Sequence, residues 1–454
     1  MSVDFDVAIV GAGPAGCIAA RELAKSGLRI ALFDANARED VGRNFVIEVE
    51  RPIYDRLMGR PPDKEESVYE QQRTRIFSPR GREVINIQGA TAVYAVYFDK
   101  ITKRMLAQAE EAGARFHEKH KAVAPLISEG HVIGIQAKTG RRTEDIKARL
   151  TIDASGYSAA IVSKLDSEMG IEYPNNRMDV VEAENHVHSI DRNMAEKAIG
   201  QGIAADDEVW STVGFAGNYS TEFSHLSIEE GRAYILVGLN AYYKRPTGDI
   251  VEGFKRRQGY FGEHLYGGWG RIRVRRTLDR LVTNGLMVVG EAACQVIPAN
   301  GSGAASGMYA GALAAEVAAR ALKTGEATTA ALWPYAWQYH IGRGRVLATY
   351  DMVRLLIERF SRRQMNNFME HGLMQPEDFF KSAEARLLTP SLASMPKRIA
   401  CLIRHPGLIP EFAIQARKVM DVSRLYKAYP RTFDIKNFRD WRIRDRELFA
   451  ALEV

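Results

Sequence analysis

The chain has 454 residues, enough for two or three domains and a sizeable core. Hydrophobic residues make up 46% of it and charged residues 26%, which is typical of a globular protein. The three cysteines, Cys17, Cys294 and Cys401, form no CxxC pair and no metal-ligand spacing, so the sequence predicts neither a disulfide framework nor a metal site. The apolar run Val7–Val10 is too short for a signal peptide, and no stretch reaches the roughly 18 apolar residues of a membrane-spanning helix. We therefore expect a cytoplasmic protein that is soluble or bound to the surface of the cytoplasmic membrane.

The N-terminal segment predicts a strand, a tight turn, a helix and a second strand. Short apolar runs of this kind are typical of strands buried in a parallel sheet. The helix ends at Gly27, a natural residue for a helix C-terminus. In chain order, the predicted elements are a strand at Phe5–Val10, a turn at Gly11–Gly16, a helix at Ala15–Ser26 and a strand at Leu28–Phe33, followed by Asp34.

Residues 36–75 are polar and contain prolines at Arg51-Pro52 and Arg60-Pro61-Pro62, so we expect an irregular stretch there. The chain then alternates between strands and one amphipathic helix up to residue 154. These elements are strands at Thr74–Phe77 and Glu83–Ile87, a helix at Asp99–Ala112, a hairpin of Lys121–Ile127 with His131–Lys138, and a strand at Ala148–Ala154.

In residues 166–276 strand-like runs dominate, which indicates a separate sheet that covers a ligand. A short, fully apolar strand then returns at Leu286–Val289, and a helix rich in glycine and alanine follows at Gly303–Leu322. After Gly325 the pattern is helical to about residue 430. The strand-like runs of the separate sheet are Val180–Glu184, Glu208–Phe215 and Ala233–Leu239.

The sequence Gly11-x-Gly13-x-x-Gly16 lies between a strand and a helix, as a dinucleotide-binding loop requires. The first glycine permits the tight turn, the second lets the backbone approach a pyrophosphate, and the third lets helix and strand pack closely. The helix N-terminus offers free N–H groups and a partial positive charge to the phosphates. Asp34, at the end of the next strand, is placed to accept both ribose hydroxyls of an adenosine. This carboxylate favours FAD or NAD over NADP, because it would repel a 2′-phosphate.

A second segment, far along the chain, distinguishes FAD from NAD. Residues 284–293 place Glu291 at the end of an apolar strand, and Gly301-Ser-Gly303 opens a helix soon after. Such an acid can hold a ribityl hydroxyl, and the helix start can set N–H groups near an electron-rich ring. NAD-dependent dehydrogenases need no such second site, so the sequence predicts FAD.

The chain resembles the FAD-dependent geranylgeranyl reductase family, within the group that shares the para-hydroxybenzoate hydroxylase fold. Three motifs carry the resemblance over roughly the first 330 residues: Gly11–Gly16 with Asp34, Ile152-Asp-Ala-Ser-Gly156, and Val289-Gly-Glu-Ala-Ala with Pro298 and Gly301-x-Gly303. The resemblance implies that Glu291 bonds the flavin ribityl chain and that Gly303 and Ala304 lie beside the isoalloxazine. The residues expected at the cofactor are Gly11, Ala12, Gly13, Pro14, Ala15, Gly16, Asp34, Arg43, Asn44, Val123, Asp153, Gly156, Gly290, Glu291, Pro298, Gly301, Gly303 and Ala304.

The resemblance also implies the domain organisation. The expected fold is α/β, with a Rossmann-type FAD-binding domain, an inserted antiparallel β-sheet substrate domain and a C-terminal helical region. The FAD-binding domain is expected at 1–75, 98–165 and 277–330, the substrate domain at 76–97 and 166–276, and the helical region at 331–454.

The chain departs from the family pattern around the flavin. The cysteine-glycine pair that the family often carries after the second strand is missing, and Arg43 and Asn44 there could meet the pyrophosphate or flavin edge or lie in a plain surface loop. The arginine usual before the helix near Asp99 is also missing from Tyr94–Phe98, so an aromatic surface could replace a charge contact.

The substrate-channel motif of the family corresponds best to Tyr219-Ser-Thr-Glu-Phe223, which lacks the tryptophan and proline. Tyr219 and Glu222 are the weak catalytic candidates, and Glu222 could supply a proton, suit a more polar substrate or point to solvent. A His186-x-His188 pair could bind metal, but no third ligand stands at a clear spacing, so we predict no metal site.

The C-terminal part is basic. Between Arg354 and Asp445 the chain has 18 Lys/Arg and 10 Asp/Glu. Such a surface could meet lipid headgroups as a peripheral membrane contact, or be a solvated helical face. The charge is not accompanied by a recognised nucleic-acid-binding motif, so we expect no nucleic-acid partner.

Three functional hypotheses follow. The first is an FAD-dependent reductase of carbon–carbon double bonds in an isoprenoid or other apolar substrate, with NAD(P)H or a ferredoxin-like protein as electron donor. The second is a flavin-dependent monooxygenase of the same fold acting on an aromatic or polyketide-like compound; a halogenase would need a WxWxIP-type motif that the chain lacks. The third is an electron-transfer flavoprotein that acts with a protein partner.

Overall fold

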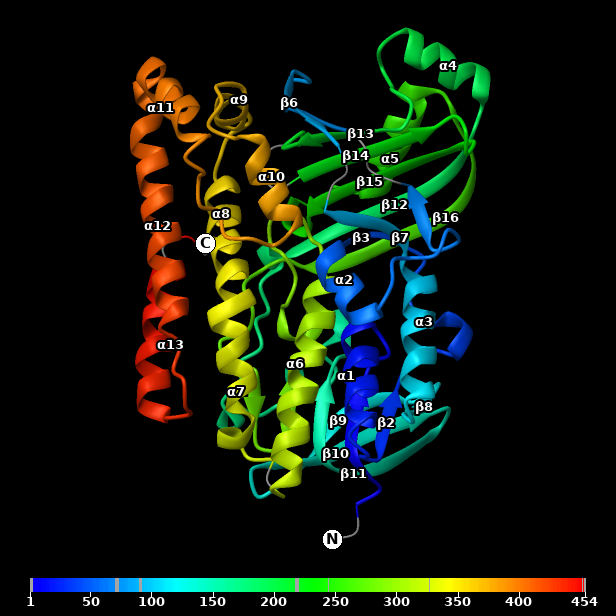
Figure 1. Cartoon of the computed structure of the whole chain (residues 1–454), viewed down its shortest axis with the longest axis vertical. Helices are drawn as coiled ribbons and strands as arrows, with labels where there is room; N and C mark the ends of the chain where they lie inside the picture. The colour runs from blue at the N-terminus through cyan, green and yellow to red at the C-terminus, as the bar shows by residue number, and fades with distance from the viewer. Residues whose placement is uncertain are drawn as a thin grey trace.

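The computed structural model describes residues 3–69, 73–89, 92–216, 220–243, 245–325, 327–450 and 452. Figure 1 shows two large sheets, one beyond the other along the long axis, with the C-terminal helices lying along one side of both. Within the described residues, no helix combines the length and apolarity needed to cross a bilayer.

An eight-stranded sheet forms the nucleotide-binding end of the molecule, in the order β17-β18-β11-β1-β2-β8, with β10 and β9 added as a hairpin on β11. β1 pairs in parallel with both β11 and β2, and its residues Val7–Val10 are buried because helices cover the sheet. Helix α1 packs against α3 and α6 on this sheet. The bounds are β1 Phe5–Val10, α1 Pro14–Ala24, β2 Ile30–Phe33, α3 Phe98–Glu111, β8 Arg115–His117, β9 Lys121–Ser128, β10 His131–Thr139, β11 Arg142–Asp153, β17 Val282–Thr283, β18 Leu286–Val288 and α6 Ala304–Lys323.

A seven-stranded sheet forms the other end, in the order β16-β12-β15-β14-β13-β5-β6. Its pairs are antiparallel except β13 with β5, which run parallel. Helix α5 packs on β12 and β15. The bounds are β5 Arg73–Phe77, β6 Glu83–Gln88, β12 Val180–Ile190, α4 Arg192–Gly200, β13 Glu208–Val213, β14 Ser220–Ser227, β15 Arg232–Asn240, α5 Thr247–Gln258 and β16 Phe261–Arg273.

A small three-stranded sheet lies between the two large ones, with β7 paired to both β3 and β4. Asn185 of β12 joins it to the seven-stranded sheet, because its side chain accepts a hydrogen bond from Val46 N (3.2 Å) and donates one to Val46 O (3.1 Å). The bounds are β3 Val46–Glu50, α2 Arg51–Met58, β4 Ser67–Tyr69 and β7 Val93–Tyr97.

The C-terminal region is helical, and α12 packs against both α8 and α13 along the side of the molecule. A π-helical turn, His340–Gly344, joins α7 to α8. The bounds are α7 Thr329–Tyr339, α8 Arg345–Ile357, α9 Arg362–Glu370, α10 Pro376–Ala383, α11 Met395–Arg404, α12 Ile409–Lys427 and α13 Ile435–Ala450.

Most predicted elements of the nucleotide-binding end are confirmed to within a few residues, but β11 begins at Arg142, six residues before the predicted start at Ala148. The prediction of an irregular stretch over 36–75 is wrong, because β3, α2, β4 and the start of β5 lie there. Pro52 occupies the first turn of α2, where its missing N–H costs no intrahelical hydrogen bond. The strands β14 and β16 and the helices α4 and α5 were not predicted either, and helices continue beyond residue 430 in α13. The domain bounds stay a prediction; β5, which begins at Arg73, pairs within the seven-stranded sheet.

Candidate cofactor and active site

A single cavity of about 920 Å³ runs from the glycine loop to the C-terminal helices. Its first part is lined by the loop residues Gly11–Ala15 and by Asp34, from the edge of the eight-stranded sheet. Its middle lies between the three-stranded and seven-stranded sheets, and its far part is lined by α8–α12. Residues that are distant in the sequence therefore share one continuous space.

The glycine loop and Asp34 lie together at one end of the cavity. Asp34 Oδ2 accepts a hydrogen bond from Ala12 N (2.8 Å), and Oδ1 accepts one from Asn36 N (2.9 Å). Helix α1 starts at Pro14, and among the described residues no side chain caps its N-terminus. The first-turn N–H groups therefore face the cavity ready for an anionic ligand.

Two of the three glycines are required by close backbone packing. Gly11 has φ +101°, and a Cβ there would overlap the carbonyl of Ala154. A Cβ on Gly16 would overlap the carbonyl oxygen of Gly11. Gly16 is thus the residue through which α1 contacts the loop, and it does not line the cavity. Gly13, by contrast, has open space where its Cβ would be.

The second predicted segment lies across the cavity from the loop. Gly290, Glu291, Gly301, Gly303 and Ala304 all line it. Glu291 Oε1 accepts a hydrogen bond from Arg273 N (3.0 Å). Burial raises the pKa of Glu291, although that hydrogen bond and the charges of Arg43 and Arg273 oppose the rise.

Helix α6 begins just after this segment, and its N-terminus likewise has no capping side chain in the part of the chain that the structure describes. Two uncapped helix starts and two carboxylates thus converge on one elongated space, which fits a dinucleotide with a phosphate at one end and a ring at the other.

Several residues expected at the cofactor lie off the cavity wall. Asp153 is fully buried and accepts hydrogen bonds from Ser155 Oγ (2.6 Å) and Val162 N (2.8 Å), so it ties down the turn after β11. Burial raises its pKa, with the hydrogen bonds acting against that. Gly156, three residues on, does line the cavity. Val123, Pro298 and Asn44 are outside the cavity lining.

The loop that lacks the family cysteine still contributes to the wall. Gly42, Arg43 and Phe45 line the cavity, and Phe98 lies beside them because its N–H donates to Phe45 O (2.9 Å). Phe98, the first residue of α3, thus adds an aromatic side chain to this part of the cavity lining.

The seven-stranded sheet presents alternate residues to the cavity. Thr221 and Phe223 of β14 line it, whereas Glu222 between them points to the other face and meets Arg257 of α5 (3.5 Å). Glu222 is therefore not positioned to act in the cavity. Burial raises its pKa, with Arg257 opposing the rise. Tyr219, the other weak candidate, lies outside the described residues.

The histidine pair does not face the cavity either. His186 pairs with Glu184 (2.9 Å) and His264 (3.0 Å). Among the described residues, no group of three or more histidine, cysteine or acidic side chains is arranged to hold a metal ion.

Sequence reasoning missed several wall residues, above all Glu48 in β3, a strand that was not predicted. Tyr157, Arg271 and Asn185 also line the cavity, as do Tyr69 and Tyr234, whose ring centroids lie 5.9 Å apart. The signal for Glu48 was present: Phe45-Val-Ile-Glu-Val is an apolar run interrupted by an acid, which needs a reason when it is buried.

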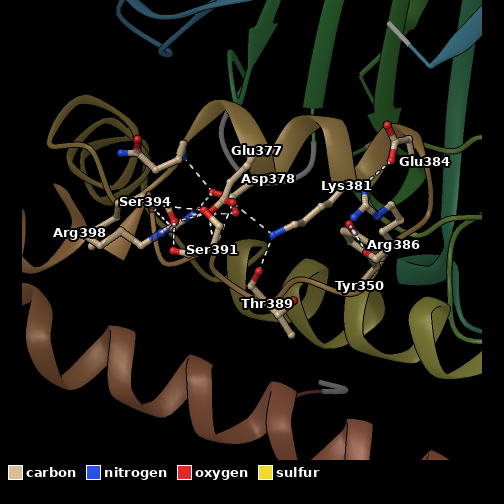
Figure 2. Close-up of polar contacts among 12 residues, drawn as sticks. Tyr350, Glu377, Asp378, Lys381, Glu384, Arg386, Thr389, Ser391, Ser394 and Arg398 are labelled. Atoms are coloured by element: carbon tan, nitrogen blue, oxygen red, sulfur yellow. Dashed lines mark hydrogen bonds and ion pairs between the residues drawn. The ribbon is translucent and has the colours of Figure 1, made fainter. Parts of the chain in front are cut away.

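The far part of the cavity is walled by α10 and the segment leading into α11, which charged groups hold together (Figure 2). Arg398 is 5% exposed and bonds both oxygens of Asp378, at 2.9 Å each, and Glu377 (3.2 Å). Glu377 also accepts hydrogen bonds from Ser391 N and Ser394 Oγ. Against the effect of burial, these hydrogen bonds and Arg398 lower the pKa of Glu377. The wall is thus held by ion pairs of the buried Arg398 with two partly exposed acids.

Comparison with known proteins finds similar FAD-dependent and flavin-dependent proteins. The family model described as FAD dependent oxidoreductase matches residues 6–190. The chain is 24% identical to digeranylgeranylglycerophospholipid reductase of Sulfolobus acidocaldarius over 94% of each chain. A geranylgeranyl bacteriochlorophyll reductase-like protein of Thermoplasma acidophilum has the same fold, with a TM-score of 0.71 and 20% identity over 90% of this chain and 99% of that one. A flavin-dependent brominase aligns with a TM-score of 0.59 and 16% identity over 89% of this chain and 99% of its own.

The fold and the site define an FAD-dependent oxidoreductase. Its matches among curated proteins include several named digeranylgeranylglycerophospholipid reductase, at 24% to 28% identity. The comparisons favour a reductase over a monooxygenase or halogenase, because the similarity to the flavin-dependent brominase is one of fold alone.

Proposed function

We propose that this chain is an FAD-dependent reductase that saturates carbon–carbon double bonds in a prenyl lipid. This proposal rests mainly on the shape of the cavity. Beside the dinucleotide site it continues into an apolar space walled by Ile357, Phe379, Phe412 and Val419. A long hydrocarbon chain gains free energy from every methylene it buries there. The names of the relatives support a lipid substrate of this kind.

We propose that FAD is held by the described cavity residues at the two helix N-termini. Asp34 would bond the adenosine ribose, the start of α1 the pyrophosphate, and Glu291 the ribityl chain. FAD bound there in its reduced form would supply hydride, while the protein orients the double bond and keeps water away. The cavity residues assigned to FAD are Gly11, Ala12, Gly13, Pro14, Ala15, Asp34, Arg43, Gly156, Gly290, Glu291, Gly301, Gly303 and Ala304.

The test is product analysis. Purified protein reconstituted with FAD and reduced by dithionite without oxygen should convert a digeranylgeranyl glycerophospholipid to species carrying two more hydrogens per reduced bond, seen by mass spectrometry. Protein without FAD is the control. If a broad panel of prenyl lipids stays unchanged, the prenyl-lipid assignment fails; an oxygen-dependent product gaining an oxygen atom would instead support the monooxygenase.

We propose NAD(P)H or a ferredoxin-like protein as the electron donor. Each donor is added separately to the oxidised holoprotein without oxygen, and bleaching of the flavin absorbance identifies the one that works. If one donor bleaches the flavin rapidly and the other does not, the first is the electron donor. If neither donor bleaches the flavin, both assignments are overturned.

We propose that α11 and the start of α12 rest on an anionic lipid surface. Leu392, just before α11, is 93% exposed and Ile403 of α11 is 73% exposed, and α11 and α12 also carry the basic residues Lys397, Arg404 and Lys418. The cavity lining reaches the same segments. Apolar side chains flanked by basic ones match an anionic membrane, and a substrate dissolved in that membrane would enter where the cavity comes closest.

Replacing Leu392 and Ile403 together by serine is expected to weaken binding to vesicles of anionic phospholipid at least about tenfold, because two apolar side chains leave the acyl boundary. Vesicle flotation measures it. The matched control is Leu265→Ser with Ile127→Ser, because these apolar residues are 50% and 39% exposed and lie on the strands β16 and β9. Equal flotation of both double variants would contradict the proposal.

A further inference from the structure

Glu48 faces the cavity from the three-stranded sheet, next to the flavin segment. It is the third residue of β3, and its side chain lines the middle of the cavity. Its backbone carbonyl accepts a hydrogen bond from Ser302 Oγ (2.8 Å). Because Ser302 lies between Gly301 and Gly303, β3 is fixed directly beside the turn that precedes α6. Glu48 therefore stands where the cofactor part of the cavity meets the apolar part.

Glu48 differs from the other acids of the cavity in its hydrogen bonding. Asp34 accepts from Ala12 N, Glu291 from Arg273 N, and Asp378 from Arg398. Glu48 Oε1 is buried, and within the described parts of the chain it has no hydrogen-bond partner. An unpaired carboxyl oxygen in such a place costs free energy unless it serves a ligand.

The surroundings of Glu48 favour its neutral, proton-carrying form. Burial raises the pKa of Glu48 to about 7. The phenols of Tyr69 and Tyr234 lie close enough to feel its charge. Burial, and after it the charge of Glu48, raises the pKa of both phenols. Because both phenols stay neutral near neutral pH, Glu48 is the one group of the three that gains or loses a proton in that range. An acid with a pKa near the working pH is suited to general acid catalysis.

We propose that Glu48 delivers the proton in double-bond reduction. This inference rests on the proposed reductase function. Saturating an alkene adds one hydride and one proton across the two carbons. The reduced flavin supplies the hydride. The O–H bond of the Glu48 carboxylic acid breaks as the second C–H bond forms, which leaves the carboxylate. Water then reprotonates the carboxylate before the next turnover.

The test is Glu48→Gln, which keeps the size and polarity of the side chain but removes its acidic proton. In a single turnover, with pre-reduced holoprotein and excess prenyl lipid, the rate of alkene loss should fall on the order of 100-fold or more. Glu48→Asp, which retains an acid, should recover part of the rate. Glu144→Gln, an exposed strand acid away from the cavity, is the matched control. FAD content of each variant shows that folding and cofactor binding persist.

Two further readouts distinguish proton delivery from a structural role. The wild-type rate should decline as pH rises through about 7, because the protonated acid is the active form, and Glu48→Gln should lose that dependence. Infrared difference spectra of the holoprotein between acid and alkaline pH should show a protonated carboxyl band that Glu48→Gln lacks, whether or not substrate turns over.

The outcomes separate the two proposals. If wild type reduces no prenyl lipid, the proposed function fails, and the infrared band still reports on the state of Glu48. If wild type is active and Glu48→Gln keeps its rate and pH dependence, proton delivery by Glu48 is overturned.

Discussion

Replacing Arg354 by methionine is expected to lower the stability of the fold by about 3–5 kcal/mol. The Arg354 side chain is 1% exposed. It donates to Asp351 (2.7 Å), Glu358 (2.8 Å) and Asp179 (3.0 Å). Methionine fills a similar volume but leaves three buried acids short of their partner, and an uncompensated buried charge is the costly case.

The loss should spread because Arg354 is part of a larger network. Asp351 also accepts from Arg276 (3.2 Å), and Arg276 bonds Asp445 of α13 (3.2 Å). Burial alone would raise the pKa of Asp351, but Arg354 and then Arg276 lower it. The network thus ties α8 and α13 to the start of β12. Arg354 also lines the cavity, so loosening it should widen the apolar part as well.

Thermal unfolding followed by tryptophan and flavin fluorescence measures the effect. Arg363→Met, an exposed position on α9, should change stability by no more than about 0.5 kcal/mol. The stability of Arg354→Lys should lie between those of Arg354→Met and Arg363→Met, because an ammonium group keeps the charge but cannot reproduce the forked contacts of a guanidinium. If the Arg354→Met variant melts at the same temperature as the Arg363→Met variant, the network contributes little to stability.

The sequence was most informative where function depends on backbone geometry. Gly11, Gly16 and Asp34 could be predicted because a tight turn, a close helix–strand contact and a terminal carboxylate leave local traces at fixed spacing. Glu291 and Gly303 could be predicted for the same reason, almost 300 residues along. The strands of the eight-stranded sheet could be predicted from short apolar runs. A strand that is buried on both faces is apolar along its whole length, so its sequence shows no alternation of polar and apolar residues.

The rest depended on contacts between distant segments. Asp153 occupies a motif position, yet its oxygens are used by the turn after β11, and spacing alone does not show which way a carboxylate points. Glu222 was singled out from a channel motif, but the period of two along β14 turns it away from the cavity.

Glu48 was missed for a different reason. Prolines at 52, 61 and 62 made its neighbourhood look irregular, although Pro52 only opens a helix. The small sheet that contains β3 is built by pairing with β7, more than 40 residues on, and such pairing has no local signature.

The glycine loop offers the second large effect, because Gly16 and Gly13 are expected to fail in different ways. In Gly16→Ala the new methyl group would overlap the carbonyl oxygen of Gly11, inside a contact made of backbone atoms that have little room to move. Helix α1 would be pushed off the loop, with a loss of stability of about 1–3 kcal/mol or more and no FAD retained on purification. In Gly13→Ala the methyl group meets open space on the protein side but occupies the cavity wall.

Gly13→Ala should therefore keep the melting temperature of the FAD-free protein and still lose FAD affinity, because the pyrophosphate can no longer approach the backbone. Gly200→Ala, at the end of α4 with open space around its Cβ position, is the control for both measurements. Melting of the FAD-free proteins and titration with FAD separate the effects. If Gly13→Ala binds FAD as wild type does, the phosphates do not pass over Gly13; if Gly16→Ala melts like Gly200→Ala, the contact between α1 and the loop is not what requires a glycine.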